Sequence, residues 1–113
     1  MKTKKIYFMD CFLAARKFHD ADEVWSELKV GTVLHLERDF DNRHDPCAVA
    51  VFYKKTCGEA FLLGYIPRKE NETIAKFLEM GWNSVFECRI SKIDEKEHPE
   101  HQVHLAIKIL RNL

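Results

Sequence analysis

The stretch RDFDNRHDPCAVAVFY, Arg38 to Tyr53, joins a polar corner to an apolar run and decides the fold class. Asp and Asn favour turns because their side chains bond nearby backbone N–H groups, and Pro46 pushes Asp45 toward an extended conformation. The run from Ala48 to Tyr53 is apolar on both faces, which is typical of a central strand. The stretch therefore predicts a tight turn that leads into the interior of a sheet.

Strands are expected on both sides of this segment. Alternating or continuous apolar patterns predict further strands at 6–15, 32–39, 61–67, 85–93 and 102–110. Inside the 61–67 strand, Gly64 indicates a bulge or the close approach of another chain. Most joints between these strands are short enough for antiparallel pairing, and the last two strands are expected to form a long hairpin.

Two helices are expected between the strands. A short helix falls within 20–31, where Asp20 or Asp22 can cap its start, and a longer helix spans 68–81. The longer helix carries an apolar stripe at i, i+3 and i+4, formed by Ile74, Phe77 and Leu78. About six strands with one short and one longer helix predict a mainly β (α+β) fold. We expect a small OB-like or SH3-like antiparallel barrel, with residues 1–113 forming one domain.

The composition is that of a globular protein. The 113 residues include 18 Lys and Arg and 18 Asp and Glu, so the formal charge is zero. This balance argues against a broad basic face that coats long DNA, but it allows a small site that grips one strand end. The four cysteines are far apart and form no CxxC, which favours reduced thiols. Neither a signal peptide nor a membrane-spanning run of about 20 apolar residues is present, so we expect a soluble, cytoplasmic protein that contacts no membrane.

The histidines and cysteines do not form a recognisable catalytic or metal motif. His98, His101 and His104 stand three residues apart, without an i, i+4 pair or a CxxC, so we expect exposed loop histidines and no bound metal. Cys47 lies near Asp45, yet sequence adjacency supplies neither an aimed base nor an oxyanion hole. Without GxSxG, P-loop or GxGxxG motifs, we expect no cofactor and no enzymatic activity. A metal-dependent nuclease or hydrolase is the weakest alternative.

Two motifs of the chain resemble the HIRAN domain family. LERDFDNRHDPCAVAVFY precedes LGYIPRKENETIAKFL, and together they fit a charged pair, N-x-x-D-x-x-A-[IV]-x-V, a G-[YH]-[IVL]-P-[KR] strand and a helix. The matching residues are Arg38, Asp39, Asn42, Asp45, Ala48, Val49, Val51, Gly64, Tyr65, Ile66, Pro67 and Arg68. The resemblance covers about residues 8–110 and implies an OB-like, DNA-binding barrel. The chain is similar to the free-standing bacterial members, rather than to the DNA-repair translocases that carry this domain at their N-terminus.

The resemblance implies nine nucleic-acid-binding residues. In the repair translocases, the domain captures single-stranded DNA at a free 3′-hydroxyl end, by aromatic stacking and by an Asn/Asp pair in the turn. In this chain the pair is Asn42 and Asp45, and His44 stands where the family often has tyrosine. The other implied residues are the aromatic pair of the first strand, Phe18 and His19, the preceding Lys17, and Tyr65, Arg68 and Lys69 near the backbone phosphates.

Elementary energetics agree with a small end-binding site. Base–aromatic stacking contributes roughly 1–3 kcal/mol per base, so two or three rings suffice for a strand end. Asp45 can accept a hydrogen bond from a sugar hydroxyl, whereas a terminal phosphate would meet repulsion from Asp41 and Asp45. Ala15 and Ala21 stand where the family commonly has glycine.

Simpler interpretations stay open for the same residues. The Asx-rich corner can be a self-satisfied turn, Phe18 can belong to the core, and the hydroxyl of Tyr65 can lie in water. Arg68 and Lys69 can form a solvated helix start. For the whole chain, a module that docks a protein partner is the alternative to a DNA-binding module. The DNA-binding hypothesis requires the implied side chains to converge on one groove.

Overall fold

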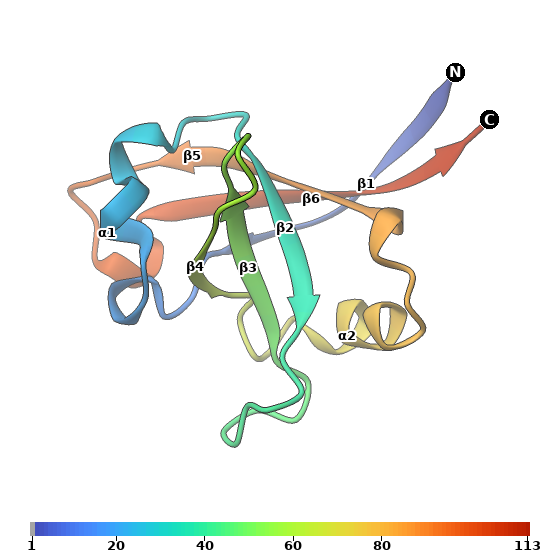
Figure 1. Cartoon of the computed structure of the whole chain (residues 1–113), viewed down its shortest axis with the longest axis horizontal. Coiled ribbons are helices and arrows are strands. Elements are labelled where there is room, and N and C mark those ends of the chain that lie inside the picture. Colours follow the sequence, from blue (N-terminus) through green and yellow to red (C-terminus); the bar gives the residue numbers. More distant parts are fainter. Residues whose placement is uncertain (1) are drawn as a thin grey trace.

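The computed structural model describes residues 2–113 and contains one six-stranded antiparallel sheet (Figure 1). Its strands are β1 (Thr3–Phe12), β2 (Val33–Arg38), β3 (Val49–Lys54), β4 (Ala60–Tyr65), β5 (Phe86–Ile93) and β6 (Val103–Asn112). They are arranged in the order β1-β6-β5-β2-β3-β4. The helices are α1 (Ala21–Val24) and α2 (Glu72–Glu79), with 3-10 turns η1 (Arg16–Phe18), η2 (Trp25–Glu27), η3 (Asn83–Val85) and η4 (Pro99–His101). The predicted mainly β fold, a small OB-like barrel, is confirmed.

The core follows the pattern read from the sequence. β3 lies between β2 and β4, and its residues Val49, Ala50 and Val51 are buried, as expected for a run that is apolar on both faces. β5 and β6 pair antiparallel as the predicted hairpin, and alternate residues are buried in the middle of β5, at Cys88 and Ile90, and in the first half of β6, from Val103 to Ile107. No helix within residues 2–113 is both long enough and apolar enough to cross a membrane.

The sheet curls back on itself where the chain leaving β1 meets β4. Ala14 donates a backbone hydrogen bond to the carbonyl of Tyr65 at 2.8 Å and accepts one from its N–H at 2.9 Å. A Cβ atom on Gly64 would overlap the carbonyl oxygen of Ala14 and lie 3.0 Å from the Leu13 side chain. The β3–β4 register also shifts next to this glycine. The bulge expected at Gly64 is therefore confirmed. A close approach also occurs there, but the approaching segment, Leu13 and Ala14, belongs to the same chain and not to another one.

The first strand ends earlier than predicted. The apolar pattern predicted a strand to Ala15, and the family resemblance placed the aromatic pair of residues 18 and 19 on the first strand. In the structure β1 ends at Phe12. Ala15 has a φ of 58°, in the left-handed region, and this reverses the chain into η1. Phe18 and His19 consequently lie on a turn beyond the strand.

The helices are shorter than predicted. The helix expected over 68–81 occupies only Glu72–Glu79, because Pro67 and Glu70 close a turn before it through a 2.9 Å hydrogen bond. The buried residues of its predicted stripe are Ile74 and Leu78, while Phe77 stays partly exposed. At α1, Asp20 occupies the N-cap position, but its side chain forms no capping hydrogen bond.

We expect Gly64→Ala to lower the free energy of unfolding by about 3 kcal/mol, because the new methyl group would overlap backbone where two segments cross. Urea denaturation followed by circular dichroism measures the loss. The control is Gly58→Ala: Gly58 has a φ of 96° and open space around it, so it should lose only about 1 kcal/mol. Equal losses at the two positions would contradict a steric requirement at Gly64.

We expect Ala15→Gly to raise the free energy of unfolding by up to about 1 kcal/mol. A Cβ atom in the left-handed region costs roughly 1–2 kcal/mol, which exceeds the extra backbone entropy that glycine adds to the unfolded chain. Ala14→Gly is the matched neighbour, and it should be destabilising because Ala14 is held in the β bridge. Thermal melting compares the Tm of each variant with that of the wild type. An unchanged or lower Tm for Ala15→Gly would contradict the conclusion that Ala15 is strained.

Candidate functional site

A groove of about 620 Å³ collects most of the residues singled out in the sequence. Its walls come from the segment after β1, the loop between β2 and β3, the end of β4 and the turn before α2. Seven of the nine predicted residues line it: Phe18, His19, Asn42, His44, Asp45, Tyr65 and Arg68. Ala14, Ala15 and Ile66 complete the lining. The convergence that the DNA-binding hypothesis requires is therefore present.

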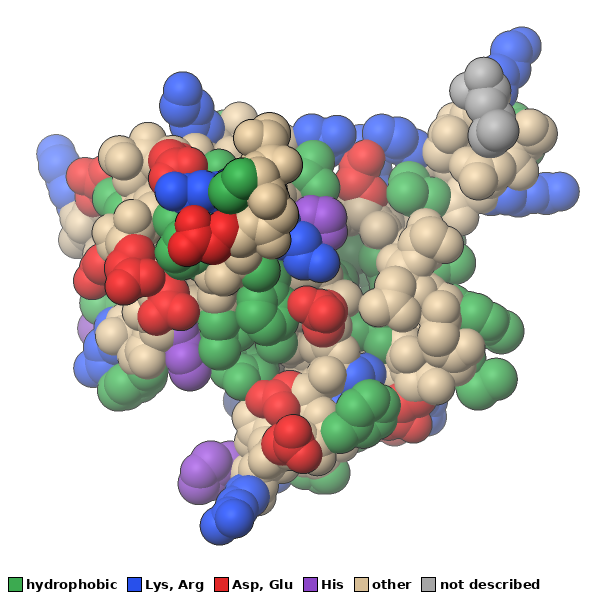
Figure 2. All heavy atoms as spheres, in the orientation of Figure 1, with side chains coloured by type: hydrophobic (Ala, Val, Ile, Leu, Met, Phe, Trp, Pro, Cys, Tyr) green, Lys and Arg blue, Asp and Glu red, His purple; other side chains and the backbone are tan. Residues whose placement is uncertain are grey.

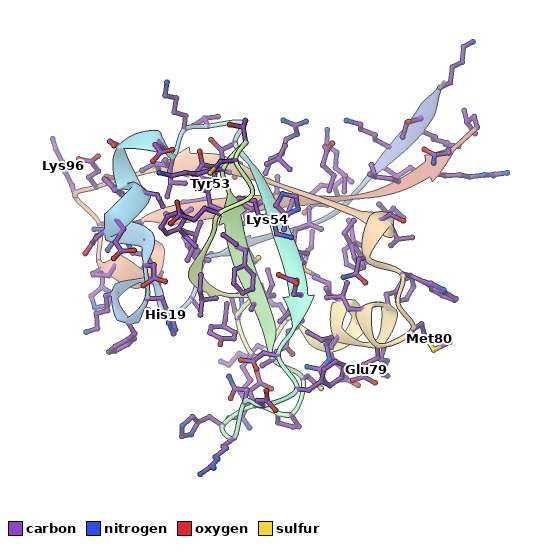
Figure 3. All side chains as sticks on the ribbon, in the orientation of Figure 1. His19, Tyr53, Lys54, Glu79, Met80 and Lys96 are labelled. Atoms are coloured by element: carbon purple, nitrogen blue, oxygen red, sulfur yellow. The ribbon has the colours of Figure 1, made fainter. Side chains whose placement is uncertain are left out.

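One wall of the groove is an aromatic platform on η1 and the residue that follows it. Phe18 is 69% exposed, so the interpretation of this ring as core is wrong. The His19 ring lies 5.4 Å from the Tyr65 ring, centroid to centroid. Figure 3 shows His19 beside η1 and α1, away from the end of the molecule that carries the two termini. Lys17 does not line the groove, but its ammonium lies 5.1 Å from the Phe18 ring.

This platform is anchored by residues that sequence reasoning did not identify. The Ala15 N–H donates to both carboxylate oxygens of Glu100, at 3.0 and 3.2 Å. Arg16 is buried, with its guanidinium 4.1 Å from the Trp25 ring centroid and 2.9 Å from a carboxylate oxygen of Asp22. These contacts link the β5–β6 loop and α1 to η1. No local signal could have identified Glu100, because its partner lies 85 residues away in the chain.

The Asx-rich corner forms the second wall. The Asn42 side-chain oxygen accepts hydrogen bonds from the N–H groups of His44 at 2.9 Å and Asp45 at 3.0 Å. One carboxylate oxygen of Asp45 accepts from the N–H of Cys47 at 2.9 Å, and the other from the buried side chain of Asn71 at 2.8 Å. The corner is thus a rigid turn, as the simpler interpretation expected. A carboxylate has about four acceptor sites, so each Asp45 oxygen retains capacity for a ligand.

The loop that carries this corner projects from the body of the barrel. Figure 2 shows histidine and basic side chains at its tip and acidic side chains nearer the sheet. His44 is exposed and lines the groove, where its imidazole is available to a ligand.

Tyr65 connects the corner to the sheet. Its hydroxyl donates a 2.6 Å hydrogen bond to Asp39, so the expectation of a hydroxyl in open water is wrong. Burial, followed by the hydrogen bond to Asp39 and the charge of that residue, raises the pKa of Tyr65 to about 12, while an interaction with the Asn42 side chain opposes the shift. Tyr65 is therefore neutral at physiological pH, and its oxygen can still accept a hydrogen bond.

The two cations before α2 are placed differently. Arg68 lines the groove from the turn that follows β4, while Lys69 is exposed beside it and is not part of the lining. Neither residue belongs to α2, which begins at Glu72. The simpler interpretation of these residues was a solvated helix start. Both residues are exposed, as it required, but they lie in a turn and not in the helix.

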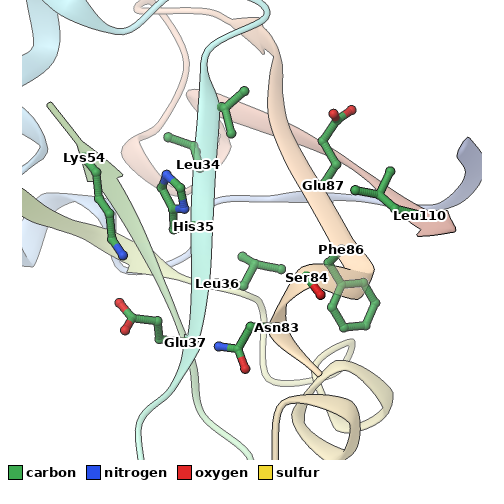
Figure 4. A pocket seen from close by; sticks show the side chains of 11 residues that line it. Leu34, His35, Leu36, Glu37, Lys54, Asn83, Ser84, Phe86, Glu87 and Leu110 are labelled. Carbon is green, nitrogen blue, oxygen red and sulfur yellow. The ribbon is translucent and has the colours of Figure 1, made fainter. Parts of the chain in front are cut away.

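A second hollow, of about 490 Å³, lies between β2 and β5 (Figure 4). It includes His35, Glu37 and Lys54, and the pKa of His35 is lowered by burial and by the nearby Lys54. None of the nine predicted residues lines it. Within residues 2–113 no group of three or more His, Cys, Asp or Glu side chains is arranged to hold a metal ion.

A family model and two solved structures match this chain. The family model described as HIRAN domain matches residues 6–109. A crystal structure of a protein from Lactobacillus plantarum has a TM-score of 0.78 at 19% identity, covering 98% of this chain and 100% of that one. The HIRAN domain of human HLTF has a TM-score of 0.65 at 12% identity, covering 94% of this chain and 78% of that one. No match was found among the curated proteins.

The two solved structures resemble this chain in fold at low sequence identity. The family model extends from within β1 to within β6 and includes every segment that forms the groove. The protein belongs to the HIRAN domain family.

Proposed function

We propose that the groove captures the end of a single DNA strand, with a free 3′-hydroxyl as the preferred terminus. The observation that carries the proposal is the convergence of three kinds of group in one groove: exposed rings, an Asx-rich corner and an arginine. HIRAN domains are binding modules rather than catalytic ones, and DNA is their ligand. The groove therefore supports a binding function without chemistry on the DNA.

Stacking supplies most of the affinity in this proposal. Four rings face the groove, those of Phe18, His19, His44 and Tyr65. Phe18 is largely exposed and offers a flat face to a base, while the contact between His19 and Tyr65 forms a second platform. Each stacked base contributes about 1–3 kcal/mol, and the contribution depends little on the identity of the base. One or two terminal nucleotides would thus be held without sequence readout.

The Asx-rich corner supplies the preference for a hydroxyl end. Its internal hydrogen bonds fix the carboxylate of Asp45 in place, so a terminal sugar hydroxyl can donate to it at little entropic cost. A terminal phosphate would approach the carboxylates of Asp45, Asp39 and Asp41, and would be repelled. These carboxylates would also repel the phosphates between nucleotides of the bound strand, unless a cation lies nearby.

Cations lie where the strand would leave the groove. Arg68 lines the groove, Lys17 lies beside the Phe18 ring, and Lys69 follows Arg68 in the turn. Two or three phosphate contacts would give a salt slope of about −1.4 to −2.1 for a single strand. This is a modest dependence, consistent with a chain of zero formal charge.

We expect Phe18→Ala to weaken the binding of a short single strand by roughly 5- to 150-fold, the equivalent of one lost stacking contact of about 1–3 kcal/mol. Fluorescence anisotropy with a short 5′-labelled strand at low salt measures the change. Trp82→Ala is the matched control, since Trp82 is also an exposed aromatic residue, at 52%, but does not line the groove. If the wild-type protein binds no short strand at low salt, the proposal is wrong and the protein-docking alternative gains.

We expect the wild-type protein to bind a strand with a 3′-hydroxyl at least about tenfold more tightly than the same strand with a 3′-phosphate. Asp45→Asn should reduce this ratio, because it removes one of the repelling charges. The ratio is taken within each variant, so any loss of folded protein cancels. A ratio near one in the wild-type protein, with both strands bound, would contradict end recognition while leaving strand binding in place.

A further inference from the structure

The two ends of the chain concentrate positive charge. Residues 2–7 and 108–113 contain five of the 18 Lys and Arg residues and none of the 18 acids. The rest of the chain therefore carries 13 basic residues against 18 acidic ones. The zero formal charge conceals a strongly basic segment on an otherwise acidic protein.

The fold brings both ends together as a two-stranded ribbon that extends beyond the end of β5, and the face that carries Lys4 and Arg111 borders a hollow shared with Phe77 and Val85. Pairing between β5 and β6 stops at Phe86 and Ile109, whereas β1 and β6 stay paired out to Thr3 and Asn112. One further hydrogen bond, from the Leu113 N–H to the Lys2 carbonyl at 2.9 Å, extends the pairing. Figure 1 shows the two termini leaving the barrel side by side, away from α1. We call residues 2–7 and 108–113 the terminal ribbon.

The cations of the terminal ribbon occupy both of its faces. Lys4 is directly opposite Arg111, so their side chains share one face. Lys5 and Lys108 lie on the other face, where the register pairs them with Leu110 and Tyr7. Figure 2 shows Lys and Arg side chains around this corner of the molecule.

Most of these cations have no ion-pair partner, although Glu87 of β5 also lies directly opposite Lys108 in the strand register. Within residues 2–113 the only ion pair of the terminal ribbon joins Lys5 to Glu87, at 2.8 Å. Hydrogen bonds from Lys5 and then Arg89 hold the pKa of Glu87 below its usual value, so this carboxylate is already engaged. Like charges directly opposite each other, such as Lys4 and Arg111, destabilise a strand pair. The ribbon therefore carries an electrostatic cost that an anionic partner would remove.

We propose that the terminal ribbon is a second nucleic-acid site that binds the phosphate walls of a DNA duplex groove. The major groove is about 12 Å wide and admits a two-stranded β-ribbon. A ribbon inside it has phosphates on both sides, which suits cations on both faces. A flat anionic membrane would contact only one face. The site is independent of strand-end capture, because the end-binding groove lies on different elements.

The test uses a ligand that the end-binding groove cannot hold. A short duplex closed at both ends by hairpin loops has no strand terminus, so binding to it does not depend on strand-end capture, and the variants below show what the ribbon contributes. We expect the wild-type protein to bind it at low salt with a slope of about −4, one counterion for each unpaired ribbon cation. The double variant Lys4→Gln/Arg111→Gln should weaken binding about tenfold and make the slope shallower by about 2.

Two further variants make the result decisive. Lys29→Gln/Lys96→Gln removes the same charge from exposed lysines elsewhere, with Lys96 at the opposite end of the molecule (Figure 3), and should bind as the wild type does. Lys4→Arg/Arg111→Lys keeps the charge and should retain the affinity. Circular dichroism and the binding of a short single strand, both expected to be unchanged, show that the variants are folded.

Four results would overturn the proposal. The first is no binding of the closed duplex at low salt, and the second is an equal loss in the Lys29/Lys96 control. The third is self-association of the Lys4/Arg111 variant in sedimentation with unchanged duplex affinity, since lysines also protect exposed strand edges from pairing. The last is binding of anionic lipid vesicles that is as tight as binding of the closed duplex, which would make a lipid surface the ligand in place of DNA. Failure of the end-binding proposal would appear separately, with the short strand.

Discussion

The backbone bridge between Ala14 and Tyr65 is the contact on which both the barrel and the groove depend. It joins the chain leaving the first strand to the last strand of the sheet, and Gly64 permits it because there is no room for a side chain at the crossing. The same two residues line the groove. The closure of the barrel and the assembly of the site are therefore one event, and a change that opens the bridge would separate the aromatic platform from the Asx-rich corner.

Rigidity around the bridge comes from side chains that bond backbone. Glu100 fixes the N–H of Ala15, and the side chains of Asn42 and Asp45 fix the loop N–H groups. Each bond replaces a contact with water by one inside the protein, so its net contribution to stability is modest, about 1 kcal/mol. Its larger effect is geometric, because groups that are already ordered lose little entropy when a ligand binds. A self-satisfied turn and a ligand-binding turn are thus compatible here: each Asp45 oxygen accepts one internal bond and retains acceptor capacity, whereas the Asn42 side-chain oxygen already accepts two.

The sequence predicted what depends on local pattern. Alternation identified the strands, the apolar run placed β3 in the interior, and the motif around Asn42 and Gly64 located the corner and the crossing. It did not predict contacts that depend on topology. Asn71 and Glu100 bond partners 26 and 85 residues away, and nothing near them in sequence marks that role. The early end of β1 was missed because alanine rarely adopts a positive φ, and only the folded context holds Ala15 there.

The distribution of charge, rather than its total, connects the two proposed sites. A formal charge of zero argues against a protein that coats DNA, yet five cations gathered at the termini leave the rest of the chain with an excess of acids. The proposed end-binding groove has acids in and beside it and one lining arginine, Arg68, whereas the terminal ribbon has cations on both faces and no acid of its own. Screening limits such fields to roughly 8–10 Å at physiological salt, and the molecule extends 40 Å along its longest axis. Opposite charge environments can therefore persist at separate ends of one small barrel, which is what the two proposed sites require.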